Sequence, residues 1–216
     1  MKINFVYEKL TDEIEKNFEF IKQHFPEKLV DSNLNNYRVL KKFTLQNVRI
    51  SDNNKDNKLD LFNDIECLDR INIIFNIHKK ETYAKSTYDN WSKLIVLSGD
   101  IANLRVIVTL LHEIGHINIK FKKTTQENVI DDVARHNMPE NSESYMAETL
   151  NEERKAHSFA LNILKKFFGK NILNKKDVMK FIHEVTLSSY STNIKLARII
   201  REINQKKKGL EHKKDS

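Results

Sequence analysis

The chain has 216 residues, which is enough for one domain of good size or for a domain with a small appended one. Charged residues make up 31% of it and the formal net charge is +7, so much of the surface must be charged. Cys67 is the only cysteine, which excludes an internal disulfide and a cysteine-rich zinc site. We expect neither a signal peptide nor a membrane span, because no apolar run reaches about 18 residues, and a cytoplasmic location fits best.

The N-terminal part is predicted to combine one helix with at least one strand. Residues 11–25 carry apolar side chains at helical spacing and are followed by Pro26, which indicates an amphipathic helix that ends there. Residues 36–51 alternate loosely between apolar and polar side chains, which favours one strand or two short ones. A polar loop follows over residues 51–58, and residues 59–68 fit a short helix.

Three strands are predicted next, directly before a long helix. Residues 71–77, 82–88 and 94–97 are rich in strand-forming side chains. Apolar side chains then recur every three or four positions over residues 101–117, which predicts an amphipathic helix of about five turns. Asp100 is a candidate N-cap for that helix.

This helix carries a His-Glu-x-x-His motif, formed by His112, Glu113 and His116. Residues four apart lie on one face of a helix, so the two imidazoles can point at a single metal ion. Glu113 would lie beside that ion, where a carboxylate can take a proton from a water molecule. Short motifs also arise by chance, but the amphipathic helix around this one favours a metal site over two structural histidines.

Beyond the motif, a long polar stretch leads to further helices. Residues 121–151 would be unusually long for a structureless loop, and residues 125–134 fit a helix within them. Residues 147–168 are predicted to form a second strong amphipathic helix. Residues 175–184 and 192–203 fit two more, for which packing together is a commoner arrangement than a DNA-reading helix-turn-helix.

A catalytic zinc site needs a third protein ligand and one open position. The metzincin extension of the motif would require Gly and His where this chain has Ile119 and Lys122, so that class is excluded. A glutamate on the following helix remains, and the candidates are Glu148, Glu152 and Glu153. Glu152 and Glu153 both share a helix face with apolar residues, so periodicity leaves the choice between them open.

The motif and the later helix together resemble the ImmA/IrrE family of metallopeptidases. The family pattern is His-Glu-aliphatic-Gly-His followed by Glu-x-x-Ala-x-x-Phe-Ala, and it matches residues 112–116 and 153–160. The resemblance implies one zinc ion per chain, held by the two motif histidines and Glu153, with Glu113 as the general base. It also implies a zincin-like fold and limited proteolysis, since relatives often cleave a partner transcriptional repressor, and a helix-turn-helix regulator is a candidate substrate.

One position departs from that pattern. The family usually has Asn after the Ala of the second helix, where this chain has His157. His157 could donate a hydrogen bond to the ligand carboxylate of Glu153, bind substrate or stabilise an oxyanion, and it could also lie on the surface. Asn151 and Glu152 match the Asn-Glu pair that begins the third-ligand motif of thermolysin-like enzymes, but the resemblance favours Glu153.

We therefore expect a mainly helical α+β fold, with a three-stranded or larger sheet before the motif helix. The expected single domain spans residues 1–204, with an N-terminal part (1–60), a catalytic core (61–168) and a helical C-terminal part (169–204). Residues 205–216 form a basic tail, which is more often a solvated end than a nucleic-acid contact.

Together these features predict a cytoplasmic zinc metallopeptidase with Glu113 as its general base and His157 as a further candidate catalytic residue. The alternative is a non-catalytic zinc-containing module that binds a protein or DNA. Either function is compatible with a toxin–antitoxin component of a mobile element.

Overall fold

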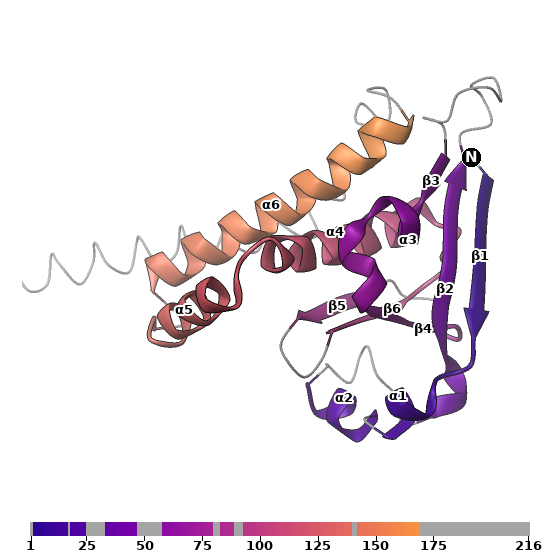
Figure 1. The fold of residues 1–216 in the computed structure, drawn as a ribbon, viewed down its shortest axis with the longest axis horizontal. Helices are drawn as coiled ribbons and strands as arrows, with labels where there is room; N and C mark the ends of the chain where they lie inside the picture. Colours follow the sequence, from indigo (N-terminus) through magenta and orange to yellow (C-terminus); the bar gives the residue numbers. More distant parts are fainter. Residues whose placement is uncertain are drawn as a thin grey trace, which may run out of the picture.

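The computed structural model describes residues 2–16, 18–24, 33–46, 58–79, 83–88, 93–139 and 142–168. Within them the fold is α+β, with helices packed on a mixed sheet (Figure 1). The strand order is β1-β2-β4-β6-β5, and β3 also pairs with β2. The strands are Lys2–Glu8 (β1), Tyr37–Gln46 (β2), Lys58–Asp60 (β3), Asn72–Asn76 (β4), Tyr83–Tyr88 (β5) and Lys93–Ser98 (β6).

The centre of the sheet is the parallel pair β4 and β6, flanked by antiparallel β2 and β5. Ile73 and Ile95 face the core that is shared with the long helices. Ile74 and Val96, the next residues along each strand, face a second core on the opposite side. Strands buried on both faces are apolar throughout, which explains why both were visible in the sequence. The three strands predicted before the motif helix are confirmed as β4, β5 and β6.

The strand β1 was not expected. It is the outermost strand of the sheet beside β2, and its pairing register shifts between Val6 and Tyr7. Both Phe5 and Val6 are exposed, so the strand lacks the regular burial that produces a clear two-residue period. The sheet is therefore larger than the three strands that the sequence marked most clearly.

The first helical stretch is confirmed as α1 (Asp12–Lys16) and α2 (Phe18–His24). Ile14 and Phe18 are buried with Tyr37 in the second core of the sheet. The helix expected over residues 59–68 is correct only in part. That stretch instead contains the end of β3, the short helix α3 (Leu61–Asp64) and most of a 3₁₀ turn, η3 (Glu66–Arg70). A further 3₁₀ turn, η1 (Leu34–Asn36), precedes β2.

The motif helix, α4, spans Leu104–Phe121 and begins later than predicted. The expected N-cap was wrong: the Asp100 carboxylate accepts a hydrogen bond from the amide of Ala102 (2.9 Å) in the turn before the helix. The cap is Asn103, whose side-chain oxygen accepts from the amide of Arg105 (2.9 Å). Asn and Asp are almost equally good caps, so the sequence did not separate the two positions.

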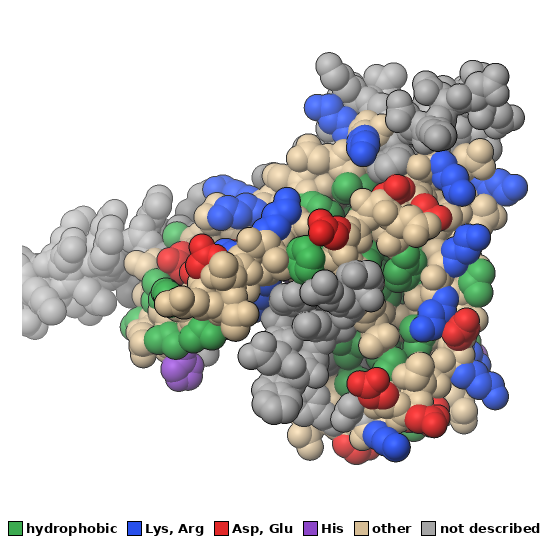
Figure 2. Space-filling view, in the orientation of Figure 1, with side chains coloured by type: hydrophobic (Ala, Val, Ile, Leu, Met, Phe, Trp, Pro, Cys, Tyr) green, Lys and Arg blue, Asp and Glu red, His purple; other side chains and the backbone are tan. Residues whose placement is uncertain are grey.

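Two more helices complete the described part of the chain. α5 (Thr125–His136) confirms the helix expected within the polar stretch, and it begins with a capping box between Thr124 and Glu127. α6 (Glu143–Phe168) begins one turn earlier than predicted and packs along α4. Hydrophobic side chains are visible over α5 at the lower left of Figure 2.

The expectations for residues 169–204 and 205–216 lie outside the described residues. In the part of the chain that is described, no helix combines the length and the apolar character needed to cross a membrane.

Candidate metal centre

α4 places both motif histidines on the side that faces α6. The apolar side chains around them, such as Leu111 and Ile114, are fully buried, so the helix cannot rotate without exposing them. His112 is buried with 6% of its surface exposed and Glu113 with 9%, while His116 is half-buried. The motif therefore lies at the edge of the core and not on a solvated face.

Gly115 allows α4 and α6 to approach closely. A Cβ atom built at Gly115 would lie 2.7 Å from the carbonyl oxygen of Ala156 and 2.8 Å from its Cα. Any side chain here would collide with the backbone of α6, so the two helices can meet at this point only because residue 115 is glycine. Glu153 lies three residues before Ala156, on the same side of α6, and this contact brings it to the histidines.

Three side chains converge at this contact: His112, His116 and Glu153. The Nε2 atoms of the two histidines are 3.1 Å apart. Glu153 places one carboxylate oxygen 3.1 Å from Nε2 of His112 and the other 3.5 Å from Nε2 of His116. In a tetrahedral zinc site with bonds of about 2.0–2.1 Å, ligand atoms lie about 3.3 Å apart. The spacing observed here fits a metal ion bound at the centre of the three groups.

The charges at this site favour a deprotonated carboxylate. Burial alone would raise the pKa of Glu153, but hydrogen bonds and charge from His112 and His116 outweigh it and lower that pKa to about 2. Burial acts to lower the pKa of His116, yet the Glu153 hydrogen bond and the nearby charges of Glu113, Glu153 and Glu152 raise it overall. A cation is therefore favoured at this position, whether it is a proton on the imidazole or a metal ion.

The structure separates the three candidate glutamates. Glu153 is the one that faces the histidines. Glu152 forms an ion pair with Arg135 of α5, at 2.6 Å, and Glu148 is exposed. Among the described residues, the group His112, His116 and Glu153 has the spacing of metal ligands.

His157 is buried beneath the site and does not lie on the surface. Its ring stacks on that of His112 with centroids 4.0 Å apart and planes inclined by 30°. Neither ring nitrogen of His157 has a hydrogen-bond partner among the described residues, so a bond to the Glu153 carboxylate, one of the roles considered for it, is not present. Burial, aided by the nearby His112, lowers the pKa of His157 to about 4. The ring is therefore neutral at pH 7, and it packs against His112, one of the candidate ligands.

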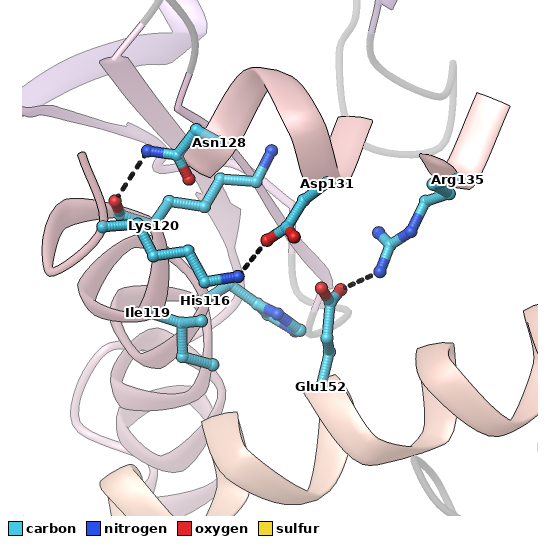
Figure 3. A pocket seen from close by; sticks show the side chains of 8 residues that line it. His116, Ile119, Lys120, Asn128, Asp131, Arg135 and Glu152 are labelled. Carbon is cyan, nitrogen blue, oxygen red and sulfur yellow. Dashed lines mark hydrogen bonds and ion pairs between the residues drawn. The ribbon is translucent and has the colours of Figure 1, made fainter. Parts of the chain in front are cut away.

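A small pocket of about 40 Å³ opens beside His116, between α4, α5 and α6 (Figure 3). Arg135 and Asp131 reach into it from α5, and Glu152 closes it from α6. Sequence reasoning did not identify Arg135 or Asp131 as neighbours of the site. The only sequence signal was that Asp131 lies on the polar face of the helix predicted over residues 125–134 and that Arg135 directly follows this range.

Comparison of the chain with known protein families, with curated proteins and with solved structures found no match in any of the three. The chemistry of the site must therefore be judged from its own geometry.

Proposed function

We propose that this chain is a zinc-dependent metallopeptidase with a zincin-like core. The observation that carries the proposal is the meeting of His112, His116 and Glu153 at the spacing of ligand atoms around one ion. A helix with the His-Glu-x-x-His motif and a glutamate from a later helix is the ligand arrangement of a thermolysin-type site. The resemblance of the two sequence blocks to the ImmA/IrrE family supports the same conclusion.

The donor set favours zinc over the other common divalent ions. Two imidazoles and one carboxylate suit zinc, whereas magnesium and calcium prefer oxygen ligands alone. Three protein ligands leave one coordination position for water or substrate, which distinguishes a catalytic zinc site from a closed structural one. A zinc ion bound here would polarise a peptide carbonyl and make water acidic near neutral pH.

Glu113 is the general base in this proposal. It follows His112 directly, is buried, and its charge acts on His116, so it lies near the proposed ligands without belonging to the group of three. Glu113 would accept a proton from the attacking water and then donate it to the leaving amine. We keep His157 as a positioning residue, because it stacks on His112 and is absent from the ligand group.

The proposed substrate is a protein that is cut at a limited number of sites in the cytoplasm. The resemblance to the ImmA/IrrE family suggests a helix-turn-helix repressor as that substrate. The small pocket beside His116 supports selective rather than general proteolysis, because it offers little room for a large side chain.

The test compares the purified full-length chain with its Glu113→Gln variant. Zinc content is measured by mass spectrometry of the metal, and cleavage is measured with a proteome-derived peptide library whose new N-termini are counted. We expect one zinc per chain in both proteins and a cleavage rate at least about 100-fold lower in the variant. A chelator should abolish cleavage and added zinc should restore it.

The proposal fails if the zinc-loaded chain cuts no more peptides than Glu113→Gln does. Zinc bound tightly without cleavage would support the alternative, a non-catalytic module that binds a protein or DNA.

A further inference from the structure

α5 is an amphipathic helix whose polar face makes the contacts to the neighbouring metal-site region, although Asp131 on that face is itself 52% exposed. Three polar contacts, through Asn128, Asp131 and Arg135, hold it to α4, to the turn after α4 and to α6. The side-chain amide of Asn128 donates to the carbonyl oxygen of Lys120 (3.0 Å), Asp131 pairs with Lys123, and Arg135 pairs with Glu152. None of the α5 side chains whose burial the structure describes is fully buried. Among the described residues, this helix is therefore held by polar contacts and not by an apolar core.

The apolar residues of α5 lie on the opposite face. Val129, Ile130 and Val133 are 53%, 59% and 54% exposed. With about 100° of rotation per residue, their mean direction is about 180° from that of Asn128, Asp131 and Arg135. A helix normally buries its apolar face and exposes its polar one. The outward apolar face of α5, visible at the lower left of Figure 2, is thus an inverted arrangement that points to a partner.

The composition of the helix narrows the class of partner. α5 carries Glu127, Asp131 and Asp132 but only one arginine, so it lacks the basic polar face of a helix that binds membranes or nucleic acid. Three half-exposed aliphatic side chains present on the order of 300 Å² of apolar surface, which is the size of a functional patch on a monomer. A stable dimer needs about 800 Å² from each partner, so a second copy of this chain would not be held by this face alone. A polypeptide that binds weakly fits both the acidic composition of the helix and the small area of its apolar face.

The position of α5 connects this face to the metal centre. The same helix that exposes Val129 and Val133 contributes Asp131 and Arg135 to the pocket beside His116. A polypeptide bound to the outer face of α5 would thus lie one helix diameter, about 10–12 Å, from that pocket. Three or four extended residues span this distance.

We propose that Val129, Ile130 and Val133 form a docking surface for an apolar segment of the polypeptide substrate, separate from the scissile bond. The identity of the occupant rests on the proposed peptidase function, whereas the docking itself requires no cleavage. Binding at this surface would raise the local concentration of the substrate at the metal centre and favour proteins over short peptides.

The test measures binding of dye-labelled β-casein, an unfolded protein with apolar segments, to the full-length Glu113→Gln chain by fluorescence anisotropy. The docking variant adds Val129→Ser and Val133→Ser. The matched control adds Val6→Ser and Ile77→Ser, which remove two aliphatic side chains of similar exposure far from α5 in the chain. We expect the dissociation constant to rise about tenfold or more in the docking variant and less than about twofold in the control.

The docking surface would be overturned if the parent protein did not bind casein, or if the docking and control variants lost casein affinity equally. It would also be overturned if sedimentation showed the parent and the control variant to be dimers and the docking variant to be a monomer. Failure of the peptidase proposal has a different signature. In that case the wild-type chain leaves casein and the peptide library uncut, while the α5-dependent binding remains.

Discussion

Gly115 of α4 lies so close to Ala156 of α6 that a Cβ atom at residue 115 would be 2.7 Å from the Ala156 carbonyl oxygen. The distance between the two helices, and so the position of Glu153 relative to the histidines, depends on one missing methyl group.

Gly115→Ala is therefore expected to destabilise the fold by about 1–3 kcal/mol and to weaken zinc binding, because the methyl group forces α6 away from α4. Urea unfolding and competition with a chromogenic chelator measure the two effects. Adding Ala156→Gly should not restore either property, since the clash is with backbone atoms and not with the Ala156 side chain. Wild-type stability and affinity in Gly115→Ala would show that the two helices are not in tight contact.

Separate replacement of the two adjacent glutamates by Gln should affect zinc affinity differently. Glu153→Gln removes the charged ligand and is expected to weaken zinc binding by more than about 100-fold, beyond the usual effect of residues that only support ligands. Glu152→Gln removes the partner of Arg135 and should leave zinc affinity within about tenfold of wild type. Isothermal titration of the metal-free proteins with zinc measures both. A larger loss of zinc affinity in Glu152→Gln than in Glu153→Gln would mean that Glu152, and not Glu153, is the third ligand.

His157 should make the metal-free protein less stable in acid. Its pKa is lowered to about 4 in the folded state, mainly by burial, against an ordinary value of 6.5. Between these values the unfolded chain takes up a proton that the folded chain does not, so the free energy of unfolding falls as the pH drops. From about pH 7.5 to about pH 5 this amounts to about 2 kcal/mol.

Urea unfolding of the metal-free wild type and of His157→Leu at both pH values isolates that contribution, because other titrating groups are common to the two proteins. The pH dependence should be smaller in His157→Leu by the amount above. His136→Leu is the matched control, since His136 is an exposed histidine of α5. An unchanged pH dependence in His157→Leu would mean that His157 is not held neutral in the folded protein.

The capping box of α5 should govern the local opening of that helix. The Thr124 hydroxyl accepts from the amide of Glu127, and the Glu127 carboxylate accepts from the amide of Thr124. Thr124→Ala is expected to destabilise α5 by about 1 kcal/mol, which speeds hydrogen exchange of its amides about fivefold without affecting the sheet. Thr125→Ala, at the first helical residue, is the control. Equal hydrogen-exchange rates of the α5 amides in the two variants would show that the capping box does not stabilise the helix.

The sheet and the motif helix could be predicted because their patterns are strong. β4 and β6 are buried on both faces, and α4 has a continuous apolar stripe. β1 could not be predicted, because it is an exposed outer strand with an irregular pairing register. The length of the polar stretch predicted a helix where α5 lies. It gave no indication of which face of that helix would be turned toward the metal-site helices.

The members of the candidate ligand group were predictable to different degrees. His112 and His116 follow from the four-residue spacing alone. Glu152 and Glu153 differ by only about 100° around one helix, and each has apolar neighbours, so local periodicity could not choose between them. The choice depends on how α6 is rotated against α4, which the contact at Gly115 and the ion pair of Glu152 with Arg135 determine.

The order of the elements along the chain has a consequence for biosynthesis. All six described strands and α4 precede α6, so a growing polypeptide presents the sheet and both histidines before Glu153 has been made. The nascent chain can thus offer an ion two imidazoles but no carboxylate from α6. In the proposed site, tight metal binding would have to wait for translation of α6, the last described helix.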